Sequence, residues 1–106
     1  MIRRTSMSRT PEEHFRSEMD AISRGDIDAI LEHFTPDCQF TDMHEGVARN
    51  REELRTYLEE YYSIVPQMTV RIVSVVTQGD RLVGEVEVDG VYTGEGCAPG
   101  GSPITL

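Results

Sequence analysis

The chain has no lysine and no tryptophan, and its 106 residues include only two cysteines. Its ten basic residues are therefore all arginine, against nineteen acidic residues, which gives a formal net charge of −9. Such an acidic surface repels phosphate groups, which argues against nucleic acids and anionic membranes as partners. The all-arginine composition is typical of a coding bias and carries no functional information.

Long hydrophobic runs are also absent. No apolar stretch approaches the roughly 20 residues that span a bilayer, and the N-terminal segment lacks the hydrophobic part of a secretory signal. A hydrophobic content of 38% suffices for one small packed core. We expect a single domain over residues 11–106 behind a disordered leader at residues 1–10.

The two cysteines, Cys38 and Cys97, form neither a CxxC pair nor a metal-binding spacing. Free thiols in a reducing compartment are the simplest interpretation and favour a cytoplasmic protein, although the sequence also permits a disulfide between them. Cys97 has no neighbouring base in its loop, so we do not expect it to act as a nucleophile.

Capping signals and hydrophobic periodicity predict a first helix over residues 11–24. Thr10 precedes Pro11, and Glu13 follows three residues after Thr10, which is a capping box with proline at the first helical position. Gly25 after the last turn is typical of a helix C-terminus.

Two further helices are expected. Asp26 can cap a helix over residues 27–34, whose apolar side chains recur at helical spacing. Asn50 and Glu53 form a second capping signature, and a long amphipathic helix follows at residues 51–65.

The remaining pattern has the two-residue period of strands. Residues 38–43 predict a short strand, and residues 68–76 and 81–94 predict two long strands joined by the turn TQGD. Residues 104–106 resemble the start of another strand after a loop rich in glycine and proline. Helices followed by a meander of strands indicate an α+β domain with helices on one face of an antiparallel sheet.

Several segments together resemble one superfamily. The stretch AISRGDIDAILEHFTPDCQFTDMHEG at residues 21–46 is similar to the opening of the nuclear transport factor two-like superfamily, which includes ketosteroid isomerases and SnoaL-like polyketide cyclases. The segments NREEL at residues 50–54 and VYTGEGCAPGGSPITL at residues 91–106 match the family further along. The resemblance covers residues 11–106, points to the SnoaL-like branch, and specifies fold better than chemistry.

This resemblance implies a cone-shaped, strongly curved antiparallel sheet that wraps the three N-terminal helices and leaves a pocket at its open end. Members of the family continue with further long strands past the position of Leu106, so we expect this chain to lack the last family strands. An unpaired sheet edge there would favour association with another chain.

Asp42 is the main candidate for a catalytic residue. The resemblance places it where the ketosteroid isomerases carry the aspartate that shuttles a proton. Alternation puts it on one face of its strand with Cys38 and Phe40, and burial in a pocket would raise its pKa and suit it to act as a base. The alternative is that Asp42 caps the turn that follows.

The resemblance leaves the other half of an isomerase site unmatched. The family's tyrosine on the first helix corresponds to about Glu18, and the family's late-strand acid lies near or beyond the end of this chain. An isomerase uses such donors to stabilise an oxyanion, so their absence argues against a true ketosteroid isomerase.

Asp42, His44 and Glu45 lie close together in the sequence, but a metal site usually needs at least three protein ligands held in one geometry. We therefore expect no metal and place His44 in an exposed loop. His14 and His33 lie beside acidic residues, and we expect both to be solvated.

Aromatic and methionine side chains on inward faces are candidates for binding a small apolar ligand, with core packing as the alternative. They are Phe15, Met19, Phe34, Phe40, Tyr57, Tyr61 and Tyr92. We interpret the chain as a pocket protein for a small apolar molecule. If it is an enzyme, the expected class is an isomerase or cyclase that uses Asp42 as general base and needs no cofactor. The alternative is a non-catalytic ligand-binding or dimerisation module.

Glu85, Glu87 and Asp89 alternate along one strand and would lie together on one face of the sheet. A solvent-facing surface explains this pattern. The resemblance also suggests a homodimer formed through the sheet, in which this row of acidic residues would border the contact.

Overall fold

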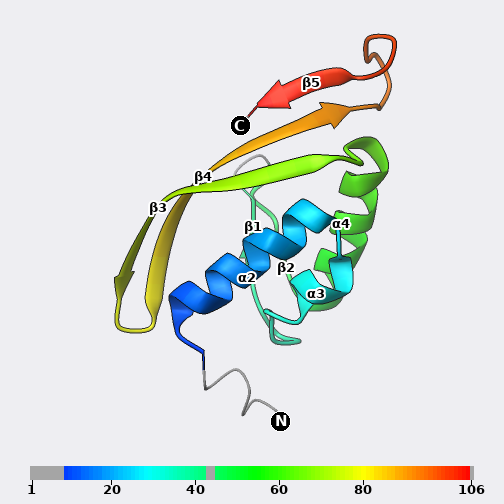
Figure 1. The fold of residues 1–106 in the computed structure, drawn as a ribbon. Coiled ribbons are helices and arrows are strands. Elements are labelled where there is room, and N and C mark those ends of the chain that lie inside the picture. Colours follow the sequence, from blue (N-terminus) through cyan, green and yellow to red (C-terminus); the bar gives the residue numbers. More distant parts are fainter. Residues whose placement is uncertain (1–8, 43–44, 106) are drawn as a thin grey trace.

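The computed structural model describes residues 9–42 and 45–105, so His44 and most of the predicted leader lie outside the described residues. The described part is an α+β domain, which confirms the predicted class (Figure 1). Its helices are α2 (Pro11–Arg24), α3 (Ile27–Leu31) and α4 (Arg51–Ile64). Its strands are β1 (Phe40–Thr41), β2 (Ala48–Arg49), β3 (Met68–Gln78), β4 (Arg81–Tyr92) and β5 (Ser102–Thr105).

Helix α2 has the predicted bounds because both of its ends are specified locally. The Thr10 hydroxyl accepts a hydrogen bond from the Glu13 amide at 3.1 Å, and the Thr10 amide donates to the Glu13 carboxylate at 2.8 Å. Gly25 ends the helix with φ 68°, a left-handed conformation that glycine adopts without steric cost. Asn50 and Glu53 form the same reciprocal box at the start of α4, as predicted.

Helix α3 is shorter than predicted and ends at Leu31 rather than at Phe34. The amides of His33 and Phe34 bond to carbonyls three residues back, at 3.2 and 3.0 Å, which is the tighter pattern of a closing turn. Proline at position 36 disfavours a helical conformation at Thr35, so the chain turns away while the apolar spacing continues.

The main sheet has the order β3-β4-β5 and is antiparallel throughout. Gly79 and Asp80 form the turn between Gln78 and Arg81, which pair with each other. A bulge interrupts the register between Ile72 and Ser74. Among the described strands, β5 pairs with β4 alone, so the sheet has an open edge and does not close into a cone.

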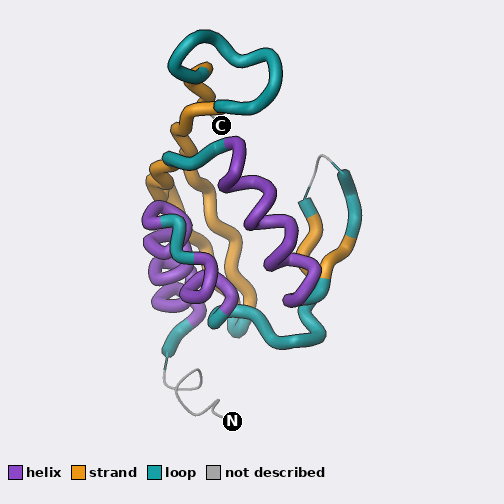
Figure 2. The backbone as a smooth tube through the Cα atoms, turned by 90° about the vertical axis from the view of Figure 1, so that its right-hand side faces the viewer, coloured by secondary structure: helices purple, strands orange, loops and turns teal. Residues whose placement is uncertain are grey.

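A second, unpredicted pairing joins β1 to β2. Phe40 lies opposite Arg49, and Thr41 lies opposite Ala48. The predicted strand over residues 38–43 is thus reduced to two residues, and part of the expected loop becomes its partner. Figure 2 shows this hairpin separated from the main sheet, on the far side of α4.

Helix α2 packs along β3 and β4, and α3 lies between α2 and α4 (Figure 1). The amide of Val70 on β3 donates to the Ser23 hydroxyl at 2.8 Å, so α2 covers part of that strand's free edge. The fully buried apolar side chains found in the described part are Ala21, Ile30, Leu31, Leu54 and Val65. This core is small, and most aromatic side chains remain only partly buried.

Candidate functional site

Four aromatic rings form a continuous series, which we call the aromatic strip: Phe34, Phe40, Tyr57 and Tyr61. The centroids of consecutive rings lie 6.2, 5.9 and 6.3 Å apart. These separations are in the range of favourable ring–ring contacts. The strip joins the turn after α3, strand β1 and helix α4, and each of its rings is partly exposed.

Arg49 lies at the middle of the strip, with its charged guanidinium group over the ring of Tyr57. Its guanidinium carbon is 4.2 Å from the centroid of Tyr57, a cation–π contact. The guanidinium also pairs with Asp42 at 2.8 Å and with Glu45 at 2.5 Å. Although burial opposes the charge, the two carboxylates hold the pKa of Arg49 above its ordinary value. Burial, together with the charge of Asp42, raises the pKa of Tyr57.

Both carboxylate oxygens of Asp42, which directly follows β1, accept hydrogen bonds. One carboxylate oxygen accepts from the Glu45 amide at 2.7 Å, and the other accepts from Arg49. The first contact confirms that Asp42 caps the following turn. Only 12% of its side chain is exposed, as for Arg49. The guanidinium stabilises the charged carboxylate, which opposes the effect expected from burial alone, and the role of Asp42 as a base stays a prediction.

The alternation predicted for this strand is confirmed by burial. Cys38, Phe40 and Asp42 are partly buried, whereas Gln39 and Thr41 are exposed. The hairpin then adds Arg49 beside the buried face, a residue that the sequence pattern had left in a loop.

Three other predicted ligand residues lie elsewhere, and their binding role stays a prediction. The Phe15 ring packs directly over Gly84 of β4, where a methyl group in place of hydrogen would lie 2.3 Å from Cζ. Met19 lies between α2 and β3. The Tyr92 hydroxyl donates to the Glu95 carbonyl at 2.9 Å, and no described ring contact joins it to the strip.

Glu18 is a candidate that the sequence analysis did not select. It lies on the packed side of α2, and burial raises the pKa of its carboxyl group to about 7. Within residues 9–42 and 45–105 its side chain has no hydrogen-bond or ion-pair partner. A signal was available in the sequence, because Phe15, Met19 and Ile22 surround Glu18 at helical spacing and place an acid within an apolar stripe.

The prediction that His14 and His33 are solvated is wrong. Their Nδ1 atoms lie 3.0 Å apart, with the ring planes near perpendicular at 88°. One nitrogen must donate and the other accept, so at least one ring is neutral in this contact. Burial, followed by the nearby His14, lowers the pKa of His33.

The described residues contain no group of three or more histidine, cysteine, aspartate or glutamate side chains placed to hold a metal ion. Cys38 and Cys97 are both free thiols and not a disulfide. Among the helices described, none is long and apolar enough to cross a membrane.

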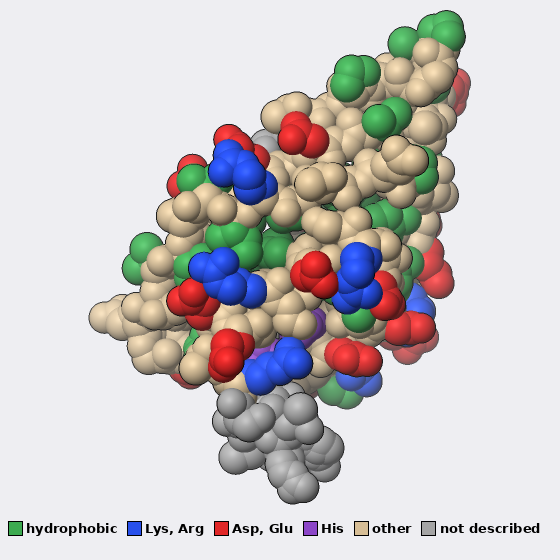
Figure 3. Space-filling view, in the orientation of Figure 1, with side chains coloured by type: hydrophobic (Ala, Val, Ile, Leu, Met, Phe, Trp, Pro, Cys, Tyr) green, Lys and Arg blue, Asp and Glu red, His purple; other side chains and the backbone are tan. Residues whose placement is uncertain are grey.

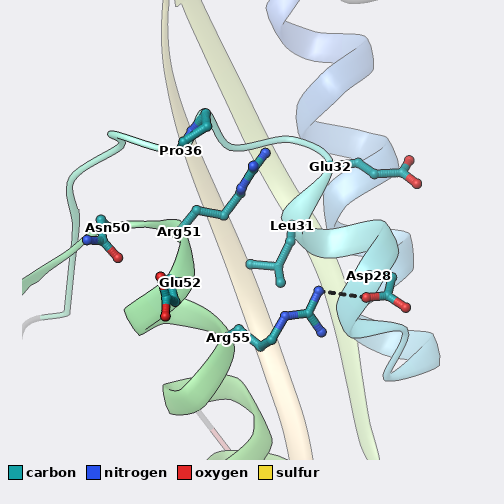
Figure 4. Close-up of a pocket in the computed structure, with 8 residues that line it drawn as sticks. All are labelled: Asp28, Leu31, Glu32, Pro36, Asn50, Arg51, Glu52 and Arg55. Carbon is teal, nitrogen blue, oxygen red and sulfur yellow. Dashed lines mark hydrogen bonds and ion pairs between the residues drawn. The ribbon is translucent and has the colours of Figure 1, made fainter.

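A separate groove of about 540 Å³ lies between α3 and the start of α4 (Figure 4). Its lining residues are Asp28, Leu31, Glu32, Pro36, Asn50, Arg51, Glu52 and Arg55. Its charged groups are already paired in part: Arg55 bridges to Asp28 at 2.8 Å, and Arg51 donates to the Phe34 carbonyl at 3.2 Å. Because charged groups of both signs line it, this groove suits a polar ligand better than an apolar one.

The surface shown in Figure 3 has hydrophobic side chains at its centre, between groups of acidic and basic side chains. The charges on this face are mixed and form no continuous basic area. A charge-bearing rim around apolar surface suits an uncharged ligand with a few polar atoms.

A sequence profile described as a SnoaL-like domain matches residues 15–105. No curated protein matches the chain. Solved structures that share the fold do so at low identity, and they include the following three. AclR from Streptomyces galilaeus, a proposed hydroxylase, is 19% identical with a TM-score of 0.74, and the match covers 90% of this chain and 63% of AclR.

IdmH from Streptomyces antibioticus, a proposed polyketide cyclase, is 21% identical with a TM-score of 0.75, over 92% of this chain and 77% of IdmH. A protein from Catenulispora acidiphila with a ketosteroid isomerase-like fold, solved with trimethylamine, is 19% identical with a TM-score of 0.74. That match covers 92% of this chain and 71% of the other. The chain thus spans less than two thirds of AclR, and at these identities the likeness establishes the fold alone.

Proposed function

Because the chain belongs to the SnoaL-like domain family, we propose that it binds a small, largely apolar ring compound against the aromatic strip, with Asp42 as the base for proton transfer. The observation that carries this proposal is the strip itself. Four partly exposed rings in contact offer an apolar surface, and the Asp42 carboxylate lies beside it, paired with Arg49. Apolar surface with a few placed polar groups is the usual composition of a small-molecule site.

The proposed chemistry is the loss of a proton from the carbon next to a ketone. The Asp42 carboxylate takes the proton, the C–H electron pair forms the C=C bond of an enolate, and the carbonyl oxygen gains the negative charge. Isomerisation and aldol-type cyclisation of ketones both begin with this step, and IdmH is a proposed cyclase of the same fold.

Hydrogen–deuterium exchange at the acidic C1 position of 2-tetralone tests the base directly, since it needs no knowledge of the natural substrate. In D₂O, NMR would follow the loss of the C1 proton signal with the wild-type protein and with Asp42→Asn. We expect the variant to lose catalysed exchange while keeping the turn, because asparagine can still accept from the Glu45 amide.

Glu45→Gln is the matched control, because it removes the other carboxylate that pairs with Arg49 and is far more exposed. Exchange should persist in this control. Equal exchange in wild type and Asp42→Asn would remove Asp42 from the mechanism.

A second candidate function is a non-catalytic ligand-binding or dimerisation module. The observation favouring it is a pair of apolar side chains on the outer face of the sheet: Val76 and Val83 lie opposite each other and are 67% and 73% exposed. Sedimentation of wild type and Val83→Asp at micromolar concentration would test it. A monomer in both cases would contradict a dimer formed through this face.

A further inference from the structure

His14 and His33 form a pair of imidazole rings that joins two separate segments of the fold. His14 lies on α2, and His33 lies in the turn that follows α3. Their Nδ1 atoms are 3.0 Å apart, and the ring planes are nearly perpendicular at 88°. Both side chains are only partly buried, which leaves small ions a path to them from solvent.

The distance between the two nitrogen atoms fits a shared metal ion. Imidazole nitrogens bind divalent metals at about 2.0–2.1 Å, so an ion equidistant from both Nδ1 atoms would bind them at an angle of about 95°. This is close to the right angle between neighbouring ligands in square-planar and octahedral complexes, and narrower than the tetrahedral angle of zinc sites. The pair therefore suits Cu²⁺ or Ni²⁺ better than Zn²⁺.

The hydrogen bond between the rings and a bound metal ion would use the same two nitrogen atoms. In the hydrogen bond one Nδ1 atom carries a proton and the other accepts it. If the donor ring carries that proton on Nε2 instead, both rings stay neutral and both Nδ1 atoms can act as ligands. An ion can thus take the place of the shared proton without any net loss of protons from the pair.

The charges around the pair do not exclude a cation. Arg9 and Glu32 act on His33 with opposite sign. The chain as a whole carries a net charge of −9, which raises the concentration of cations near its surface. Within residues 9–42 and 45–105, no set of three histidine, cysteine, aspartate or glutamate side chains is placed to hold a metal, so water would fill the remaining positions.

We propose that the Nδ1 atoms of His14 and His33 together bind one divalent transition-metal ion, Cu²⁺ or Ni²⁺, with water as the remaining ligands. The ion links α2 to the turn after α3. With two protein ligands, the site binds its ion reversibly and more weakly than a centre with three or four. Asp42 and the rings of the aromatic strip take no part in it, so the site is independent of the proposed function.

Titration with Ni²⁺ tests the site without any substrate. Paramagnetic Ni²⁺ broadens the NMR signals of protons close to it. In the wild type the imidazole signals of His14 and His33 should broaden together, at lower Ni²⁺ concentrations than other signals. The Tm should also rise with Ni²⁺, because the ion binds the folded state. Cu²⁺ should compete for the same site and bind more tightly than Ni²⁺.

Two variants remove one ligand each. In His14→Gln and His33→Gln, the glutamine amide can still form a hydrogen bond with the remaining imidazole. Each variant should bind Ni²⁺ at least about tenfold more weakly, because a second imidazole nitrogen is no longer held beside the first. His44→Gln is the matched control, since it removes the third histidine of the chain and should leave the affinity unchanged.

The results that would overturn the proposal are specific. Equal affinity for Ni²⁺ in the wild type and in both variants of the pair would show that the two rings do not bind the ion. A loss of affinity in His44→Gln as large as in those variants would place the ion elsewhere. Broadening of His44 before His14 and His33 in the wild-type spectrum would do the same, and this measurement remains decisive if a variant does not fold.

Discussion

Replacing Glu18 with glutamine should change how the stability of the domain depends on pH. Burial raises the pKa of Glu18 from 4.5 in the unfolded chain to about 7 in the fold. A raised pKa in an acid stabilises the fold fully below the unfolded value, and this contribution is lost as the pH rises through the folded value. The wild type therefore loses stability between about pH 4.5 and pH 7 through this group.

The magnitude follows from the shift. The difference between 4.5 and about 7, at about 1.4 kcal/mol per unit, corresponds to about 3 kcal/mol. Small domains have total stabilities of only about 5–15 kcal/mol, so the change is large enough to measure. Glutamine cannot ionise, and Glu18→Gln should gain about 3 kcal/mol relative to the wild type between pH 4 and pH 8.

Urea denaturation of both proteins at each pH unit from 4 to 8 provides the measurement. The histidine contribution cancels in the difference, because both proteins contain the pair of His14 and His33. Glu59→Gln removes the same charge from an exposed position and controls for net charge. A wild-type curve parallel to that of Glu18→Gln would show that Glu18 ionises normally and would refute its interior placement.

Three further predictions concern other contacts. His33→Gln should abolish part of the loss of stability at acid pH. Burial and then His14 lower the pKa of His33 in the fold, so below pH 6.5 the unfolded chain takes up the proton first and is favoured. Equal losses of Tm between pH 7.5 and pH 5.5 in the wild type and in His33→Gln would contradict this. Gly84→Ala should lower the free energy of unfolding by about 1–3 kcal/mol in urea denaturation, because the new methyl group would clash with the Phe15 ring at 2.3 Å. An unchanged denaturation midpoint would show that the ring packs elsewhere. Asn50→Ala should lower the free energy of unfolding by about 1 kcal/mol through loss of the α4 cap, whereas Asn50→Asp should keep most of that stability. Equal losses of stability in the two variants would argue against capping.

The predictable parts of the fold were those whose information is local. The capping boxes at Thr10 and Asn50 located the starts of two helices, because each box is closed by a residue three positions away. Gly25 marked a helix end for the same reason. The superfamily resemblance then identified the family, which the profile match over residues 15–105 confirms.

Contacts between distant residues could not be read from these patterns. The pairing of β1 with β2 depends on how the chain closes after Asp42, and it brings Arg49 back across seven residues. His14 and His33 are nineteen residues apart and meet only because α3 folds back along α2. Local patterns therefore identified the strand that carries the candidate base but not the arginine that pairs with it.

The environments of Asp42 and Glu18 favour opposite forms of the same chemical group. Asp42 has a guanidinium at 2.8 Å, which stabilises its charged form, whereas burial raises the pKa of Glu18 to about 7 and so favours its neutral form. Forming an enolate requires a base at carbon and a donor at oxygen under one set of conditions. The salt bridge to Arg49 at Asp42 and the packed side of α2 at Glu18 therefore act in opposite directions on the proton affinities of the two carboxyl groups.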